Sequence, residues 1–79
     1  MRVIINAATI KNITDISVNV TKYSTEVFLY IKEKPDDENF IRNFKSRSNA
    51  IVCTMQYYAE VEVWVLILSY NNPKIDIGV

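Results

Sequence analysis

Two carboxylates spaced two residues apart are the first candidates for chemistry in this sequence. Glu60 and Glu62 begin the stretch 60–70, which reads EVEVWVLILSY. If this stretch is a strand, both side chains point to one face about 7 Å apart, a separation that paired-carboxylate catalysis could use. No second motif supports a pocket around them. The favoured interpretation is that they are solvated charges that protect an aggregation-prone apolar run.

The residue types that are missing exclude other chemistries. The chain has one cysteine, Cys53, and no histidine, so the thiol has no imidazole base and no zinc ligand set can form. We expect Cys53 to pack in the core as a small apolar side chain. The acidic run 36–38 lacks the spacing of a calcium loop, and with Gly78 as the only glycine no phosphate-binding loop exists. We therefore expect no enzymatic activity, no cofactor and no metal.

Length and charge limit the remaining classes. The 79 residues are expected to form one domain, residues 1–79. Nine basic residues balance nine acidic ones, which argues against a protein held to DNA mainly by charge. The apolar run 63–68 is far shorter than the roughly 20 residues of a membrane-spanning helix, and no targeting segment is visible. With a single cysteine, we expect a cytoplasmic protein without a membrane partner.

The clearest strands are expected to form a hairpin. Residues 16–21 alternate apolar and polar side chains, and a second strand follows at 26–33. The expected register places Ile16 opposite Ile31. All apolar side chains of the pair then fall on one face, whereas a slip by one residue would scatter them over both.

One helix is expected after this hairpin, over residues 36–47. Asp36 suits the N-cap position, and Lys45 and Arg47 in the last turn match the helix dipole. A narrow apolar stripe should pack against one face of the sheet. The stripe consists of Phe40, Ile41 and Phe44, and the face that it should cover bears Val18, Val20, Val27 and Leu29.

The long segment 50–70 must turn or bend. As one straight strand it would span about 65 Å, whereas a compact domain of this size has a radius of gyration near ~12 Å. A hairpin with its loop at 58–60 would place Cys53 opposite Val65 with consistent faces, but the loop lacks the usual turn residues. A bulged strand that switches between two sheets is the alternative.

These elements predict an α+β fold. The expected order is β-β-β-α-β-β, an antiparallel sheet of five or six strands with one helix packed on one face. The first strand lies near residues 3–6, and a short strand at 75–79 follows the turn at Asn71–Lys74 and should lie at an edge.

A single short helix cannot cover both faces of such a sheet, and both faces carry large apolar side chains. An uncovered face of this kind exceeds what a monomer usually exposes. Either the strands close into a barrel or the second face is an interface, and the polar Ser17 and Asn19 on that face favour an interface with a polar rim. We therefore expect a homodimer or a partner protein on the second face, with the terminal strand extending the contact by edge pairing. The residues expected at this interface are Phe28, Tyr30, Trp64, Leu66, Leu68, Ile75 and Ile77.

Two functional classes remain. The first is a small protein-binding module, such as an inhibitor that binds and blocks a host protein, because the abundance of Ile, Asn, Lys and Tyr with few Gly, Arg and Pro is typical of phage and mobile-element proteins. The second is a single-stranded nucleic-acid binder with aromatic side chains on the sheet and a basic helix end. It would use Arg42, Lys45, Arg47, Tyr57 and Tyr58. The zero net charge favours the first class.

Overall fold

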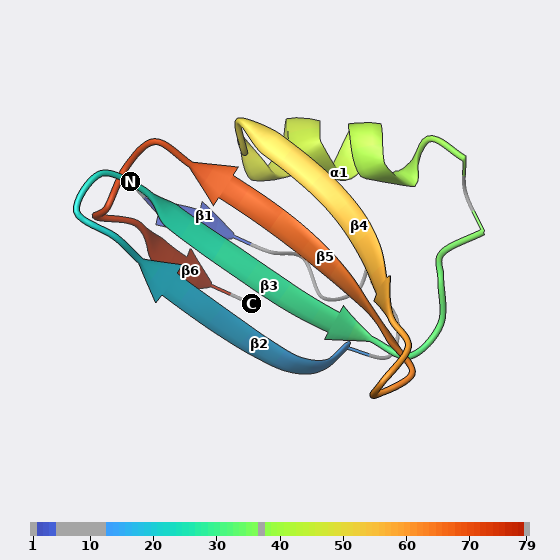
Figure 1. Ribbon diagram of the computed structural model, residues 1–79. Coiled ribbons are helices and arrows are strands. Elements are labelled where there is room, and N and C mark those ends of the chain that lie inside the picture. Colours follow the sequence, from blue (N-terminus) through green and yellow to red (C-terminus); the bar gives the residue numbers. More distant parts are fainter. Residues whose placement is uncertain (1, 5–12, 37, 79) are drawn as a thin grey trace.

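The computed structural model describes residues 2–4, 13–36 and 38–78 of the chain. Its elements are, in chain order, β1 (Arg2–Ile4), β2 (Ile13–Val20), β3 (Thr25–Ile31), α1 (Phe40–Ser48), β4 (Val52–Tyr58), β5 (Val63–Tyr70) and β6 (Asp76–Gly78). Figure 1 shows one helix and a twisted antiparallel sheet, so the predicted α+β class is confirmed.

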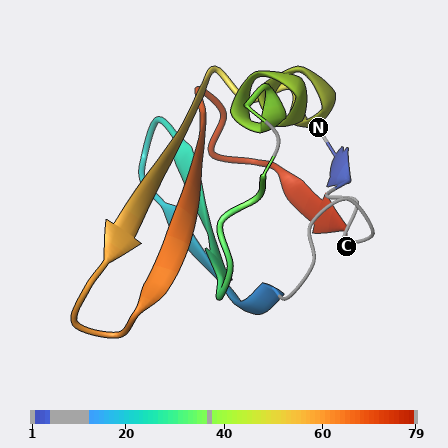
Figure 2. The ribbon, with the colours of Figure 1, turned by 90° about the vertical axis from the view of Figure 1, so that its right-hand side faces the viewer.

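The main sheet has four strands in the order β2-β3-β5-β4. The prediction of one sheet of five or six strands is wrong, because β1 and β6 pair with each other, in parallel, as a separate two-stranded sheet. A turn after β5 explains why β6 does not extend the main sheet: the Asn72 carbonyl accepts a bond from Thr25 Oγ1, and its side-chain oxygen accepts one from the Lys74 N–H, both at 2.8 Å. This turn directs the chain to the side of the sheet on which α1 also lies (Figure 2).

The β2–β3 hairpin has the predicted faces but a different register. Ile16 lies opposite Leu29 instead of Ile31, a shift of two residues. An even shift keeps every side chain on its face, because strand side chains alternate with a period of two. The turn is set by Thr21, whose N–H donates to the Ser24 carbonyl (2.9 Å) and whose hydroxyl accepts the Ser24 N–H (3.1 Å).

The segment 50–70 is a hairpin and not a bent strand. Its register differs from the prediction by three residues, so Cys53 lies opposite Leu68 and not Val65. An odd shift reverses the faces of β5 relative to β4. The expectation that residues 60–62 belong to the strand is also wrong, because β5 begins at Val63 and Glu62 adopts a left-handed φ of 53° in the turn.

Helix α1 is shorter than predicted and begins at Phe40, not at Asp36. Asn39 holds the N-cap position without a side-chain cap bond, whereas Lys45 and Arg47 occupy the last turn as predicted. The C-cap Asn49 has a φ of 58°, a left-handed conformation that asparagine tolerates better than most residues.

The helix packs through two aromatic rings. Phe40 and Phe44 are buried and stack with their ring centroids 5.6 Å apart, whereas Ile41 is 37% exposed. The predicted three-residue stripe therefore has two members. They join a core with β3 and β5 residues, while α1 itself contacts the edge strand β4.

The predicted docking face is correct for β3 and wrong for β2. Val27 and Leu29 are fully buried in the core that α1 covers, but Val18 and Val20, on the far edge strand, remain 46% and 58% exposed. At the other end of the core, the Tyr70 hydroxyl donates to the Ser48 carbonyl at 2.9 Å and so ties the end of β5 to the end of α1.

Candidate protein-interaction face

The side of the main sheet opposite α1 is its open face, which no described element covers (Figures 1 and 2). Its members follow from the strand registers, because residues directly opposite each other on neighbouring strands project to the same side. They are Asp15, Ser17 and Asn19 of β2, Glu26, Phe28 and Tyr30 of β3, Val63, Val65, Ile67 and Ser69 of β5, and Val52, Thr54, Gln56 and Tyr58 of β4.

The centre of the open face is apolar. Phe28 lies opposite Ile67, and Tyr30 lies opposite Val65. Val65 is fully buried and lies between Tyr30 and Gln56, its partners on the neighbouring strands, while the other central apolar side chains are half-buried. The sheet thus presents a broad apolar strip over β3 and β5, with polar residues of β2 and β4 beside it.

The charged strand residues of the open face are acidic. Among its strand residues only Asp15 and Glu26 carry charge, and no lysine or arginine is present. At one end of the face, the β4–β5 turn adds Glu60 and Glu62, both exposed. An apolar strip with an acidic border favours a partner surface with an apolar centre and basic neighbours.

The interface residues predicted from the sequence do not share one surface. Phe28 and Tyr30 lie on the open face, but Leu66 and Leu68 lie on the opposite side and are fully buried in the core of this chain. Trp64 lies on that same covered side and is half-buried.

The remaining two predicted interface residues follow β5. Ile75 is half-buried against the core. Only the backbone of Ile77 is described, and it pairs with Val3 in the small parallel sheet. Because β6 pairs with β1 in this way, the terminal strand does not extend the main sheet.

The residues that the sequence suggests for nucleic-acid contacts are also divided. Tyr57 points to the covered side and packs on Trp64 with the ring centroids 5.0 Å apart, whereas Tyr58 lies on the open face. The basic residues Arg42, Lys45 and Arg47 are on α1, across the sheet from Tyr58. Since the open face itself is acidic, phosphate groups would be repelled where aromatic side chains are available for stacking.

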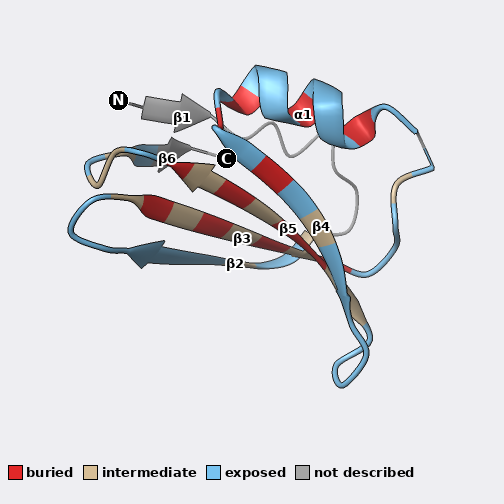
Figure 3. Ribbon diagram, turned by 45° about the horizontal axis from the view of Figure 1, so that its top comes forward, coloured by how far each residue is buried: buried red, intermediate tan, exposed pale blue. Residues whose placement is uncertain are grey.

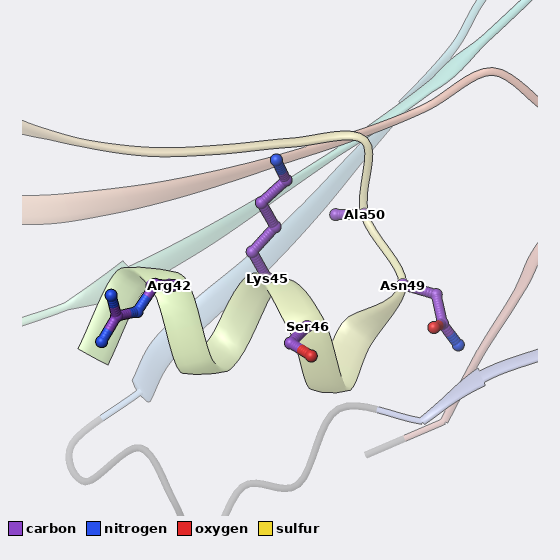
Figure 4. Close-up of a pocket in the computed structure, with 5 residues that line it drawn as sticks. All are labelled: Arg42, Lys45, Ser46, Asn49 and Ala50. Atoms are coloured by element: carbon purple, nitrogen blue, oxygen red, sulfur yellow. The ribbon is translucent and has the colours of Figure 1, made fainter. Parts of the chain in front are cut away.

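A shallow hollow of about 490 Å³ lies beside two of these basic residues. Figure 4 shows its side chains, and those of Arg42, Lys45, Ser46 and Asn49 point in different directions and do not converge on one point. Arg42 also donates a 2.9 Å hydrogen bond to the Asn39 side chain. The hollow therefore lacks the convergent polar groups of a built anion site.

The carboxylates that the sequence offers for chemistry do not lie side by side on a strand. Glu60 and Glu62 belong to the turn 59–62 and are exposed, so the strand geometry expected for a carboxylate pair does not occur. Among the described residues, no cluster of three or more Cys, Asp and Glu side chains is placed to hold a metal ion.

Cys53 is expected to be unreactive in the native protein. Burial in the core raises the pKa of its thiol to about 11, although nearby Lys45 opposes this shift. Only the thiolate is nucleophilic, so roughly one thiol in a thousand is reactive at pH 8. A disulfide reagent should therefore label the single cysteine slowly in buffer and completely in denaturant. Complete labelling within seconds in buffer would contradict the buried position.

The interface predicted from the sequence omits the apolar β5 members of the open face, namely Val63, Val65 and Ile67. No signal within β5 identifies them, because its side chains are apolar on both sides and only the register set by the β4–β5 turn decides which side lies on the open face. No protein-family model, curated protein or solved structure matches the chain. Within the described part of the chain, no helix has the length and apolar character needed to cross a membrane.

Proposed function

We propose that this chain is a small, non-enzymatic module that binds another protein through the open face. One observation carries the proposal: the apolar strip over β3 and β5 has no cover from any described element (Figure 2). Such a strip is typical of a contact surface, because contiguous apolar patches on monomers are usually small. The composition favours a phage or mobile-element protein that blocks a host protein in this way.

The partner is expected to offer an apolar patch bordered by basic side chains. Asp15 and Glu26 lie on the face itself, and Glu60 and Glu62 lie at its end. Opposite charges around an apolar centre orient two proteins and raise the rate of association. The acidic border also ranks the single-stranded nucleic-acid alternative below protein binding.

Photo-crosslinking in the source cell would test this proposal. We expect p-benzoylphenylalanine in place of Thr54, an exposed open-face residue on β4, to form one discrete protein adduct. The matched position is Ile41, exposed on α1 across the sheet, which should form no adduct. An Ile67→Glu change should abolish the adduct at position 54, because it places a charge in the strip.

Three outcomes would contradict the proposal. They are no adduct at position 54, equal adducts at positions 54 and 41, and an adduct with nucleic acid in place of protein. The Ile67→Glu variant must keep its native circular dichroism, which separates loss of contact from loss of fold.

A further inference from the structure

We propose that the outer edge of β2 pairs antiparallel with β2 of a second copy of this chain, joining two main sheets into one. β2 is an edge strand of the sheet, and no described segment pairs with its outer side. Figure 3 shows β2 almost entirely in the colour of exposed residues. Its second half, Ser17–Val20, contains no charge, proline or glycine, the devices that usually protect an edge strand.

The hydrogen-bond pattern identifies which backbone groups point outward. Thr21 donates its N–H to Ser24, so this position is bonded toward β3. Backbone groups alternate between the two sides of an antiparallel strand. The N–H and C=O groups of Val18 and Val20 therefore point away from β3, as does the N–H of Ile16.

One of these outward groups is already occupied. The Ile16 N–H donates to the Asp15 carboxylate at 2.8 Å, and the ladder has an irregularity between Ile13 and Asp15. The first half of β2 is thus protected against strand addition, whereas Val18 and Val20 remain available. This difference selects one register for a second copy.

A twofold axis beside Asn19 satisfies the available groups. Val18 of one copy then lies opposite Val20 of the other, and each exchanges its N–H and C=O bonds with its partner without displacing Asp15. The same register packs the exposed side chains of Val18 and Val20 against their symmetry mates on one face.

The exposed side chains of β2 match a second copy of the same strand. In the twofold register each exposed Val18 meets an exposed Val20 of the other copy, and the symmetry repeats this apolar pair on the other side of the axis. This self-matching pattern favours a second copy as the occupant over an unrelated peptide strand. The open faces of both copies become parts of one continuous sheet surface.

A disulfide trap tests the register directly. At the axis, two Asn19 residues face each other in a non-hydrogen-bonded pair with a Cα separation of about 4.5 Å, within the range that a disulfide bridges. We expect Asn19→Cys to form a covalent dimer under mild oxidation. The control Ser17→Cys should not, because its symmetry mate lies on the order of 13 Å away along the strand.

Sedimentation of the full chain tests the interface. The wild type is expected to be dimeric at high micromolar concentration, and Val18→Lys should raise the dissociation constant roughly tenfold or more, since an edge lysine opposes strand addition. Val52→Lys is the matched control, an equally exposed valine (46%) on the other edge strand, and it should remain dimeric.

Three results would overturn the proposal. The first is a wild type that stays monomeric at high micromolar concentration. The second is dissociation by Val52→Lys, and the third is equal crosslinking of the two cysteine variants. Circular dichroism verifies the fold of each variant, and the cysteine pair decides the question if Val18→Lys does not fold.

Discussion

Replacement of Leu66 by alanine is expected to lower the free energy of unfolding by roughly 3 kcal/mol. Leu66 is fully buried at the centre of β5, with Leu29 opposite it on β3 and Met55 opposite it on β4. The truncation would leave a cavity that these side chains cannot fill. Since a domain of this size has a total stability of about 4–12 kcal/mol, the loss is a large share of it.

The adjacent residue provides the control. Ile67 lies on the open face and is half-buried, so Ile67→Ala should cost only about 1 kcal/mol, well below the cost for a fully buried side chain. Urea unfolding followed by the fluorescence of Trp64, the only tryptophan, would measure both values. Equal losses would show that β5 presents both faces to the interior and that the open face is covered.

Phe44→Ala is expected to cost roughly 3–4 kcal/mol. The Phe44 ring is 4% exposed, stacks on Phe40 and joins the core under α1. Without it the helix keeps one aromatic contact to the sheet. We expect a lower melting temperature together with a loss of helical circular dichroism.

Ile41→Ala, on the same helix, is the matched variant. Ile41 is 37% exposed, and alanine has the higher helix propensity, so the free energy of unfolding should change by less than ~1 kcal/mol. A loss as large as that of Phe44→Ala would contradict the orientation of α1. Such a loss would indicate that Ile41 packs against the sheet together with Phe40 and Phe44, as the sequence alone suggests.

Alternation along a strand predicts faces but not partners. In the β2–β3 hairpin the assumed register is wrong by two residues, yet Val27 and Leu29 still lie on the helix-covered side. In the β4–β5 hairpin the error is three residues, so Leu66 and Leu68 move from the expected interface into the core. Because β5 is apolar on both sides, its own pattern could not reveal the odd shift.

The turns explain why the registers could not be predicted. Neither hairpin loop contains glycine, proline or asparagine at its tip, the residues that signal turn geometry in a sequence. The first turn depends on the Thr21 side chain, and the second on a glutamate, Glu62, with positive φ. Both turn conformations depend on the strands that flank them in the folded chain. No local sequence pattern identifies either one.

The patterns of alternation and of the helical stripe predicted the α+β class but not the members of the open face. A single helix and a sheet with apolar residues on both sides already imply an open surface. Which β5 residues lie on this surface depends on whether the register set by the β4–β5 turn is shifted by an odd or an even number of residues. Phe28 and Tyr30 lie on the open face because β3 alternates clearly between its two sides.

The pairing of β3 with β5 has a consequence for how the chain folds. Each hairpin closes over a short turn, so its strands can meet at little cost in chain entropy. The pairing of β3 with β5, which joins the two hairpins, costs more chain entropy. It brings together Ile31 and Trp64, which are separated in the sequence by the whole of α1 and β4. Most of the core, including Leu29 and Leu66, is removed from water only when this pairing forms. We therefore expect the search for this long-range pairing to slow the folding of the main sheet, since non-local contacts must overcome the entropy of loop closure before they stabilise the chain.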